Sequence, residues 1–164
     1  MNTSTVEYPE SYPDRLRIAG RAVDNVFEPT ECLYLRFVSY DPQTGRPDFG
    51  DIRCPDQSVN RSKYSEPDDV LWCRQVYLKE QGFGSFFVSQ IPPLLRDGKG
   101  QEIGFRVEHD PVIESIVDLE NYSHSEVRAH NQTGRQRKVS KLIKTMFQQS
   151  IAEALSVLKL PRAI

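Results

Sequence analysis

Residues 32–40, CLYLRFVSY, decide the fold class because they form the clearest β-strand pattern in the sequence. Leu33, Leu35 and Phe37 fall on one face of such a strand, and more polar side chains fall on the other. Arg36 lies in the middle of this apolar segment, where a charge must be paired or must reach water. The pattern predicts a half-buried strand in which Arg36 either pairs inside the protein or points into a ligand cleft.

Shorter patterns on both sides of this strand predict the neighbouring elements. Alternating apolar residues favour an antiparallel pair of strands at 83–91 and 102–108, and a weaker strand at 15–26. The segment 41–60 is rich in proline and glycine and lacks apolar periodicity, which predicts a long, irregular and mobile loop. Ser65, followed by a proline and acidic residues, is typical of the start of a short helix.

The strongest helical pattern lies near the C-terminus. Thr133 and Gln136 have the spacing of a capping box, and apolar residues recur every three or four positions from there to Leu158. This pattern predicts one long amphipathic helix over 133–158 and makes Phe147 part of its buried face.

The order of these elements indicates the fold class. Strands come first and the main helix comes last, and the spacing of apolar residues at 112–119 favours a shorter helix, with a strand as the alternative. We therefore expect an α+β fold, mainly an antiparallel sheet with the long C-terminal amphipathic helix packed on it. Residues 1–14 hold two prolines among polar residues and are expected to form an extended or disordered arm, which leaves 15–164 as a single domain.

Composition excludes several classes of protein. The 164 residues are 38% hydrophobic, and no apolar run approaches the roughly 18 residues that a membrane span needs. No apolar signal segment is visible at the start, so a cytoplasmic protein is expected. The three cysteines, Cys32, Cys54 and Cys73, are widely spaced and form no C-x-x-C motif, which argues against disulfides and a zinc knuckle.

Charge is distributed unevenly along a chain whose net charge is only -2. Residues 102–126 contain seven acidic side chains and one basic side chain, whereas residues 127–144 contain six basic side chains and no acidic one. Bases at the start of the predicted C-terminal helix oppose the helix dipole, while the free backbone N–H groups there favour an anion. The basic segment is therefore predicted to hold a phosphate, to dock on an acidic partner, or to meet the protein's own acidic stretch.

The segment 122–130, YSHSEVRAH, contains the residue types of an acid–base site. We select His124, Glu126 and Arg128 as candidate catalytic residues. A histidine beside a carboxylate can move protons near neutral pH, and an arginine can hold a phosphoryl oxygen. The alternative is structural: Ser123 and Glu126 have capping-box spacing, which would make Glu126 a cap and the histidines surface residues.

Other polar residues suit contacts with phosphates and bases. The segment 58–64 supplies hydroxyls, two cations and an aromatic ring, although the same mixture is common in polar loops. The candidate ligand-binding residues are Arg36, Arg61, Lys63, Tyr64, Tyr122, His130, Arg135, Arg137 and Lys138.

No motif identifies a metal or a cofactor. His109, His124 and His130 with nearby acids could ligate a metal, but their spacing matches no metalloprotease or deaminase pattern. The sequence also lacks dinucleotide-binding, P-loop and hydrolase motifs. We therefore expect no metal and no cofactor.

Two functions remain after these exclusions. The first is an intracellular protein that binds a phosphate-rich ligand, RNA or a nucleotide, and that cleaves phosphodiesters without a metal if it is an enzyme. The second is a non-catalytic subunit that meets protein partners through its charged segments.

Overall fold

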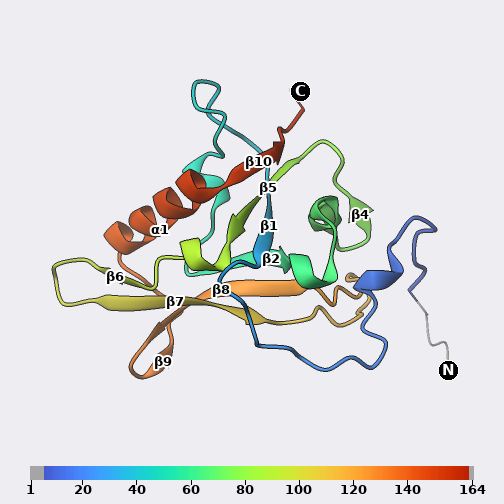
Figure 1. Ribbon diagram of the computed structural model, residues 1–164, viewed down its shortest axis with the longest axis horizontal. Helices are drawn as coiled ribbons and strands as arrows, with labels where there is room; N and C mark the ends of the chain where they lie inside the picture. The colour runs from blue at the N-terminus through green and yellow to red at the C-terminus, as the bar shows by residue number, and fades with distance from the viewer. Residues whose placement is uncertain (1–5, 163–164) are drawn as a thin grey trace.

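An antiparallel sheet of eight strands dominates the computed structural model, which describes residues 6–162 (Figure 1). Its strand order is β10-β5-β1-β2-β8-β7-β6, and β9 pairs with β8. These strands are β1 (Cys32–Phe37), β2 (Asp56–Arg61), β5 (Gly82–Phe87), β6 (Leu94–Arg96), β7 (Glu102–His109), β8 (His124–Asn131), β9 (Gly134–Arg135) and β10 (Ser156–Lys159). The fold is thus α+β, mostly antiparallel sheet with one C-terminal helix.

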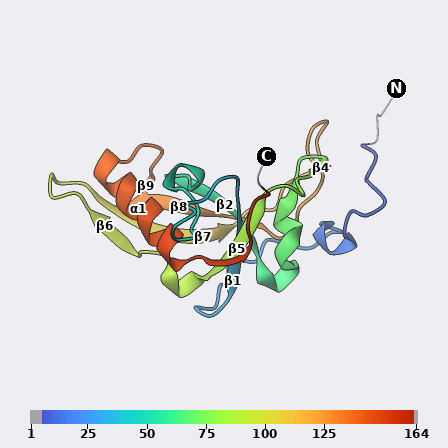
Figure 2. The same cartoon turned by 90° about the horizontal axis from the view of Figure 1, so that it is seen from above.

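The remaining elements are short, apart from α1 (Lys141–Ala154). A separate two-stranded hairpin consists of β3 (Trp72–Cys73) and β4 (Val76–Tyr77). The 3₁₀ helices are η1 (Asp14–Leu16), η2 (Phe49–Asp51), η3 (Ser62–Tyr64), η4 (Pro67–Leu71) and η5 (Val88–Gln90). Figures 1 and 2 show α1 at one end of the molecule, with the N-terminal segment and β4 at the other.

The hydrophobic core lies between one face of the sheet and α1. Leu33, Leu35 and Phe37 are buried as their alternation predicts, so β1 is confirmed. Phe147 of α1 is fully buried and stacks on Phe105 of β7, with ring centroids 4.4 Å apart. Burial of such rings supplies much of the free energy that stabilises a domain of this size.

The start of the C-terminal helix was predicted wrongly. Thr133 belongs to the turn between β8 and β9, where the side chain of Asn131 accepts hydrogen bonds from both the backbone N–H and the hydroxyl of Thr133. The helix begins after Ser140, whose hydroxyl accepts a hydrogen bond from the backbone N–H of Ile143. It ends at Ala154 because the following residues pair with β5 as strand β10.

Two other segments for which a helix was considered, 112–119 and 122–130, contain none. Segment 112–119 is irregular, because the Ser115 hydroxyl accepts hydrogen bonds from the N–H groups of Val117 and Asp118 and so competes with helical bonding. Segment 122–130, where the capping-box alternative for Ser123 and Glu126 would require a helix, is mostly strand β8.

Predicted strands and loops were partly right. The loop prediction for 41–60 fails at its end, since β2 begins at Asp56 and lies between β1 and β8. β2 was not predicted because its sequence, DQSVNR, is mostly polar and lacks apolar alternation. The strands expected at 83–91 and 102–108 exist as β5 and β7, but they pair with other strands rather than with each other.

The N-terminal half differs from the predicted elements at 15–26 and after Ser65. The weak strand expected at 15–26 is instead η1 followed by irregular chain. The short helix expected after Ser65 is η4, a 3₁₀ helix capped by Glu66, with Asp69 completing the capping box. Tyr12, in the segment expected to be an arm, is buried against Leu16 and Leu119.

Candidate functional site

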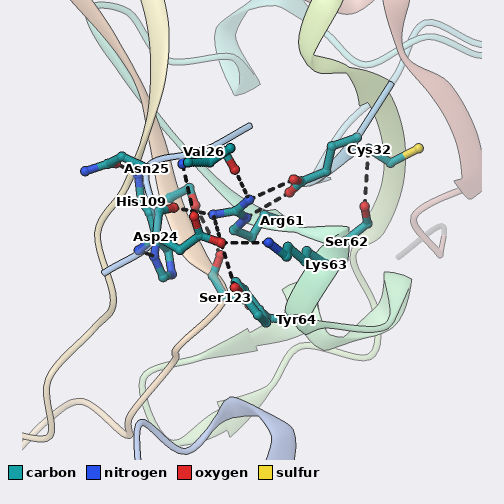
Figure 3. Close-up of polar contacts among 12 residues, drawn as sticks. Asp24, Asn25, Val26, Cys32, Arg61, Ser62, Lys63, Tyr64, His109 and Ser123 are labelled. Atoms are coloured by element: carbon teal, nitrogen blue, oxygen red, sulfur yellow. Dashed lines mark hydrogen bonds and ion pairs between the residues drawn. The ribbon is translucent and has the colours of Figure 1, made fainter. Parts of the chain in front are cut away.

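Arg61, at the end of β2, is the centre of a buried polar cluster (Figure 3). Its side chain is 0% exposed, and its Nε and Nη2 each donate to the carboxylate of Glu31 at 2.8 Å. Nη1 donates to the backbone oxygen of Asp24, and Nη2 also donates to that of Val26 at 2.8 Å. The guanidinium lies 3.9 Å from the ring centroid of Phe27. All three nitrogens of this arginine are therefore bound within the protein.

Two more predicted ligand residues belong to the same cluster. The Tyr64 hydroxyl and the Lys63 ammonium donate to Oδ2 of Asp24 at 2.7 and 2.9 Å. Hydrogen bonds from Tyr64 and Lys63 hold the pKa of Asp24 well below its usual range. These contacts use the polar groups that the sequence suggested for phosphate binding.

His109, the last residue of β7, and Tyr122, in the turn before β8, complete the cluster. Nδ1 of His109 accepts the backbone N–H of Asp24 at 2.8 Å, and Nε2 lies 2.5 Å from the backbone oxygen of Tyr122. A carbonyl only accepts hydrogen bonds, so Nε2 carries the proton and the ring is neutral. Burial lowers the pKa of His109. The Tyr122 hydroxyl donates to the oxygen of Ala22, so the cluster as a whole fastens residues 22–31 to the sheet.

The three predicted catalytic residues share one face of β8, opposite to the hydrophobic core. His124, Glu126 and Arg128 alternate with buried residues along the strand. Arg128 donates to Glu126 at 2.9 Å, and it also bonds Glu108 at 2.8 Å and Asp110 at 2.6 Å. Burial opposes the charge of Arg128, but these carboxylates outweigh it and raise its pKa. Arg128 is therefore neutralised by acids of the 102–126 segment.

The basic segment thus meets the protein's own acids at two of its members, Arg128 and Arg135. Arg135 lies 2.7 Å from Oδ2 of Asp56, while Arg137 and Lys138 are exposed and precede α1. None of these residues lies at the N-terminus of a long helix, so the expected dipole argument does not apply to them. His130 Nε2 lies 2.8 Å from Oε1 of Glu108 without hydrogen-bond geometry.

A pocket of about 380 Å³ lies on the face of the sheet opposite to the core. Its floor comes from β1, β2 and β8, through Arg36, Asn60 and His124. The β3–β4 hairpin and the 112–121 segment form its sides. Its volume lies within the range of small-molecule sites.

Three arginines and few acids line this pocket. Arg36, Arg53 and Arg74 contribute cationic side chains, and none of them forms an ion pair within residues 6–162. Asp51 and Asp118 also line the pocket. The carboxylate of Asp51 accepts three hydrogen bonds from Val38 and Ser39, and that of Asp118 accepts one from the Ser115 hydroxyl. The wall therefore offers cationic donors to an anion.

Asn60 supplies the most informative polar group in the pocket. The residue is 2% exposed, and its Oδ1 accepts a hydrogen bond from Nδ2 of Asn121 at 2.9 Å. Its Nδ2 has no partner among the described residues. A buried donor without an acceptor costs about 1–3 kcal/mol, which a ligand oxygen can recover.

His124 also lines the pocket. Its Nδ1 lies 2.6 Å from the backbone oxygen of Asp110, which accepts the Nδ1 proton, so Nε2 is the ring nitrogen left for other contacts. Trp72, the single tryptophan of the chain, also lines the pocket.

Sequence reasoning found part of this pocket. Arg36 and His124 were selected as site residues and do line it. The other selected residues lie in the cluster around Arg61, on β8 and β9, or, for Arg137 and Lys138, between β9 and α1. Asn60, Arg53, Arg74 and Cys73 were not selected. Recognition of β2 as a central strand would have placed Asn60 on the face opposite to Arg61 by period-2 alternation, but its unpartnered amide appears only in the folded chain.

The described residues contain neither a metal-binding arrangement nor a membrane-spanning helix. No set of three His, Cys, Asp or Glu side chains within residues 6–162 is arranged to hold a metal ion. Within the same residues, no helix is long and apolar enough to cross a membrane. No protein-family model, no curated protein sequence and no solved structure matches this chain.

Proposed function

We propose that this protein binds a small phosphate-bearing ligand, of the size of a nucleotide, in the pocket lined by Arg36, Asn60 and His124. The observation that carries the proposal is the unpartnered Nδ2 of Asn60, buried in a pocket that also holds three arginines without ion pairs in the described chain. A phosphate oxygen accepts hydrogen bonds from both kinds of donor. A cation would find no such match.

The pocket supplies complementary groups for the two parts of a nucleotide. Arg36 offers a planar, permanently charged donor from the floor, and Arg53 and Arg74 add positive charge at the rim. Trp72 provides an apolar, aromatic surface against which a base can pack. A nucleotide therefore fits the lining better than inorganic phosphate alone.

The proposal concerns binding and leaves out phosphodiester cleavage. Of the three residues selected for catalysis, His124 lines the pocket, whereas Glu126 and Arg128 are bound to each other. A second acid or base for cleavage would have to come from elsewhere.

Fluorescence of Trp72 gives a direct test, because this is the only tryptophan in the chain. The purified protein would be titrated with adenosine monophosphate and, separately, with adenosine. We expect saturable fluorescence change with the monophosphate and much weaker binding of adenosine. Replacing Arg36 by Gln removes a charged donor, which should weaken binding about tenfold or more.

Two further variants separate the pocket from the basic segment. Asn60→Asp keeps the oxygen that Asn121 bonds but replaces the free donor with a negative charge, so it should also weaken binding. Arg137→Gln, at an exposed position outside the pocket, is the matched control and should leave binding unchanged. Loss of binding in the Arg137→Gln control alone would overturn the proposal in favour of the basic segment. Equal binding of adenosine and adenosine monophosphate would also overturn it, because the pocket would then not recognise phosphate.

A further inference from the structure

Cys73 places a thiol in the wall of the same pocket. It is the last residue of β3, it is half-buried, and its Sγ accepts a hydrogen bond from Nη2 of Arg36 at 3.2 Å. A guanidinium that donates to sulfur stabilises the negative charge that the sulfur carries when it acts as a nucleophile. Cys73 therefore combines access from the pocket with a cationic partner.

The other two cysteines lack this combination. Burial raises the pKa of the Cys54 thiol to about 11, so its reactive thiolate form is rare near neutral pH. Cys32 begins β1 and is not part of the pocket lining. Neither sulfur accepts a hydrogen bond from an arginine within the described chain.

The surroundings of Cys73 also favour an anionic reactant. Arg53 and Arg74 add positive charge to the pocket, and the buried Nδ2 of Asn60 is a second, independent group that lacks an acceptor. Carboxylates of an entering molecule can accept hydrogen bonds from these donors. A disulfide that carries carboxylates meets both requirements, since it brings an electrophilic sulfur and negative charge together.

We infer that Cys73 is a site of reversible thiolation by anionic low-molecular-weight disulfides. The Cys73 thiolate attacks one sulfur of the disulfide, a new S–S bond forms to Cys73, and the old S–S bond breaks. The leaving thiolate takes up the proton that the Cys73 thiol had released to water. No external oxidant is needed, because the disulfide is itself reduced as Cys73 is oxidised.

This inference goes beyond the proposed function and does not depend on it. The mixed disulfide would fill the space beside Arg36, so thiolation would block any ligand that uses the pocket. Reduction by a free thiol would reopen the pocket by the same exchange in reverse. The modification would thereby make pocket access respond to the thiol–disulfide balance.

The test measures which cysteine reacts, and with which disulfide. The full chain would be incubated near neutral pH with oxidised glutathione, which is anionic, or with cystamine, which is cationic, then quenched with acid and mapped by mass spectrometry. With oxidised glutathione, we expect Cys73 to react about tenfold faster than Cys32 or Cys54. The rate of each disulfide with Cys73 would be divided by its rate with a free thiol in solution. This ratio should be larger for anionic oxidised glutathione than for cationic cystamine.

Two substitutions connect the rate to the pocket. Arg36→Gln removes the donor to Sγ and should slow thiolation of Cys73 severalfold, and Arg53→Gln, an exposed rim residue, should remove part of the preference for the anionic disulfide. Circular dichroism would verify that both variants are folded. Equal rates at Cys73 and Cys32, or a Cys73 rate that neither variant changes, would overturn the inference. Because the readout is a covalent product, the result is independent of whether a phosphate ligand binds.

Discussion

Asn60 and Arg61 are consecutive residues of β2 whose side chains point to opposite faces of the sheet and have opposite hydrogen-bonding states. Every guanidinium nitrogen of Arg61 is bound to Asp24, Val26 or Glu31, whereas Nδ2 of Asn60 has no partner in the described chain. Alternation along the strand separates a structural cluster from a ligand pocket by a single residue.

Arg61 should be essential for stability. Arg61→Ala leaves the carboxylate of Glu31 without its partner in a site where the arginine is fully buried, so the free energy of unfolding should fall by about 3–5 kcal/mol. Urea denaturation measures this change. Lys63→Gln is the control, because Lys63 is half exposed and solvent screens its ion pair with Asp24, so this variant should lose much less stability. Similar losses in both variants would show that the buried cluster does not hold residues 22–31.

Stability should fall in mildly acidic solution because of His109. Burial lowers the pKa of this histidine in the folded protein, so below its ordinary pKa of about 6.5 the unfolded chain takes up the proton first. The stabilisation is therefore fully present above that value and is lost as the pH falls through the folded-state pKa. Asp24, whose pKa is also lowered, adds a loss at lower pH, below about 4.

Chemical denaturation at a series of pH values isolates the contribution of His109. His109→Gln keeps one hydrogen-bond acceptor and one donor but does not titrate, so its stability should depend less on pH just below about 6.5. If the variant and the wild-type protein lose stability in parallel across that interval, His109 is not the responsible group.

Phe147 should anchor α1 to the sheet. Its side chain is fully buried and stacks on Phe105, so Phe147→Ala should lower the free energy of unfolding by about 3–5 kcal/mol. Leu142 lies on the same helix but is 52% exposed, and Leu142→Ala should cost much less. Thermal melting of both variants provides the comparison. A loss below about 1 kcal/mol for Phe147→Ala would contradict the packing of α1 on the sheet.

Gly84 should be required for the close approach of β10 to β5. A methyl group at this position would lie 2.6 Å from the backbone oxygen of Ser156 and 2.8 Å from Cγ of Leu155. Gly84→Ala should therefore destabilise the protein by about 1–3 kcal/mol, as overpacking does. Gly50→Ala is a matched control, since nothing lies within 4 Å of the added group. Equal melting temperatures for the two variants would show that β10 does not pack as described.

The sequence predicted the apolar part of this fold better than the polar part. The alternation around Leu35 identified β1 because a half-buried strand must show period 2. The sequence DQSVNR of β2 gave no such signal, since its core-facing residues include Gln57 and Arg61, whose burial depends on distant partners such as Glu31. Thr133 likewise resembled a helix cap, but the turn formed with Asn131 satisfied the same groups locally.

The residues of the candidate site were likewise predictable only where the sequence itself marks them as unusual. Arg36 was recognisable because a charge stood within an apolar strand, and His124 because histidines are rare in this chain. Asn60 was not recognisable, because an unpartnered amide can be identified only after the chain is folded and its hydrogen bonds are known. Two of the three acids that neutralise Arg128, Glu108 and Asp110, come from β7 and the residue after it, so their pairing with Arg128 also required the sheet register.

Mapping of NMR chemical shifts tests the central claim most directly, because it locates the bound ligand. Uniformly ¹⁵N-labelled protein would be titrated with adenosine monophosphate, and backbone amides, the side-chain amide of Asn60 and the indole N–H of Trp72 would be followed. The account predicts that the largest shifts occur at Asn60, Trp72 and Arg36, which line the pocket. Shifts concentrated at residues 135–138, with the Asn60 amide unchanged, would contradict it.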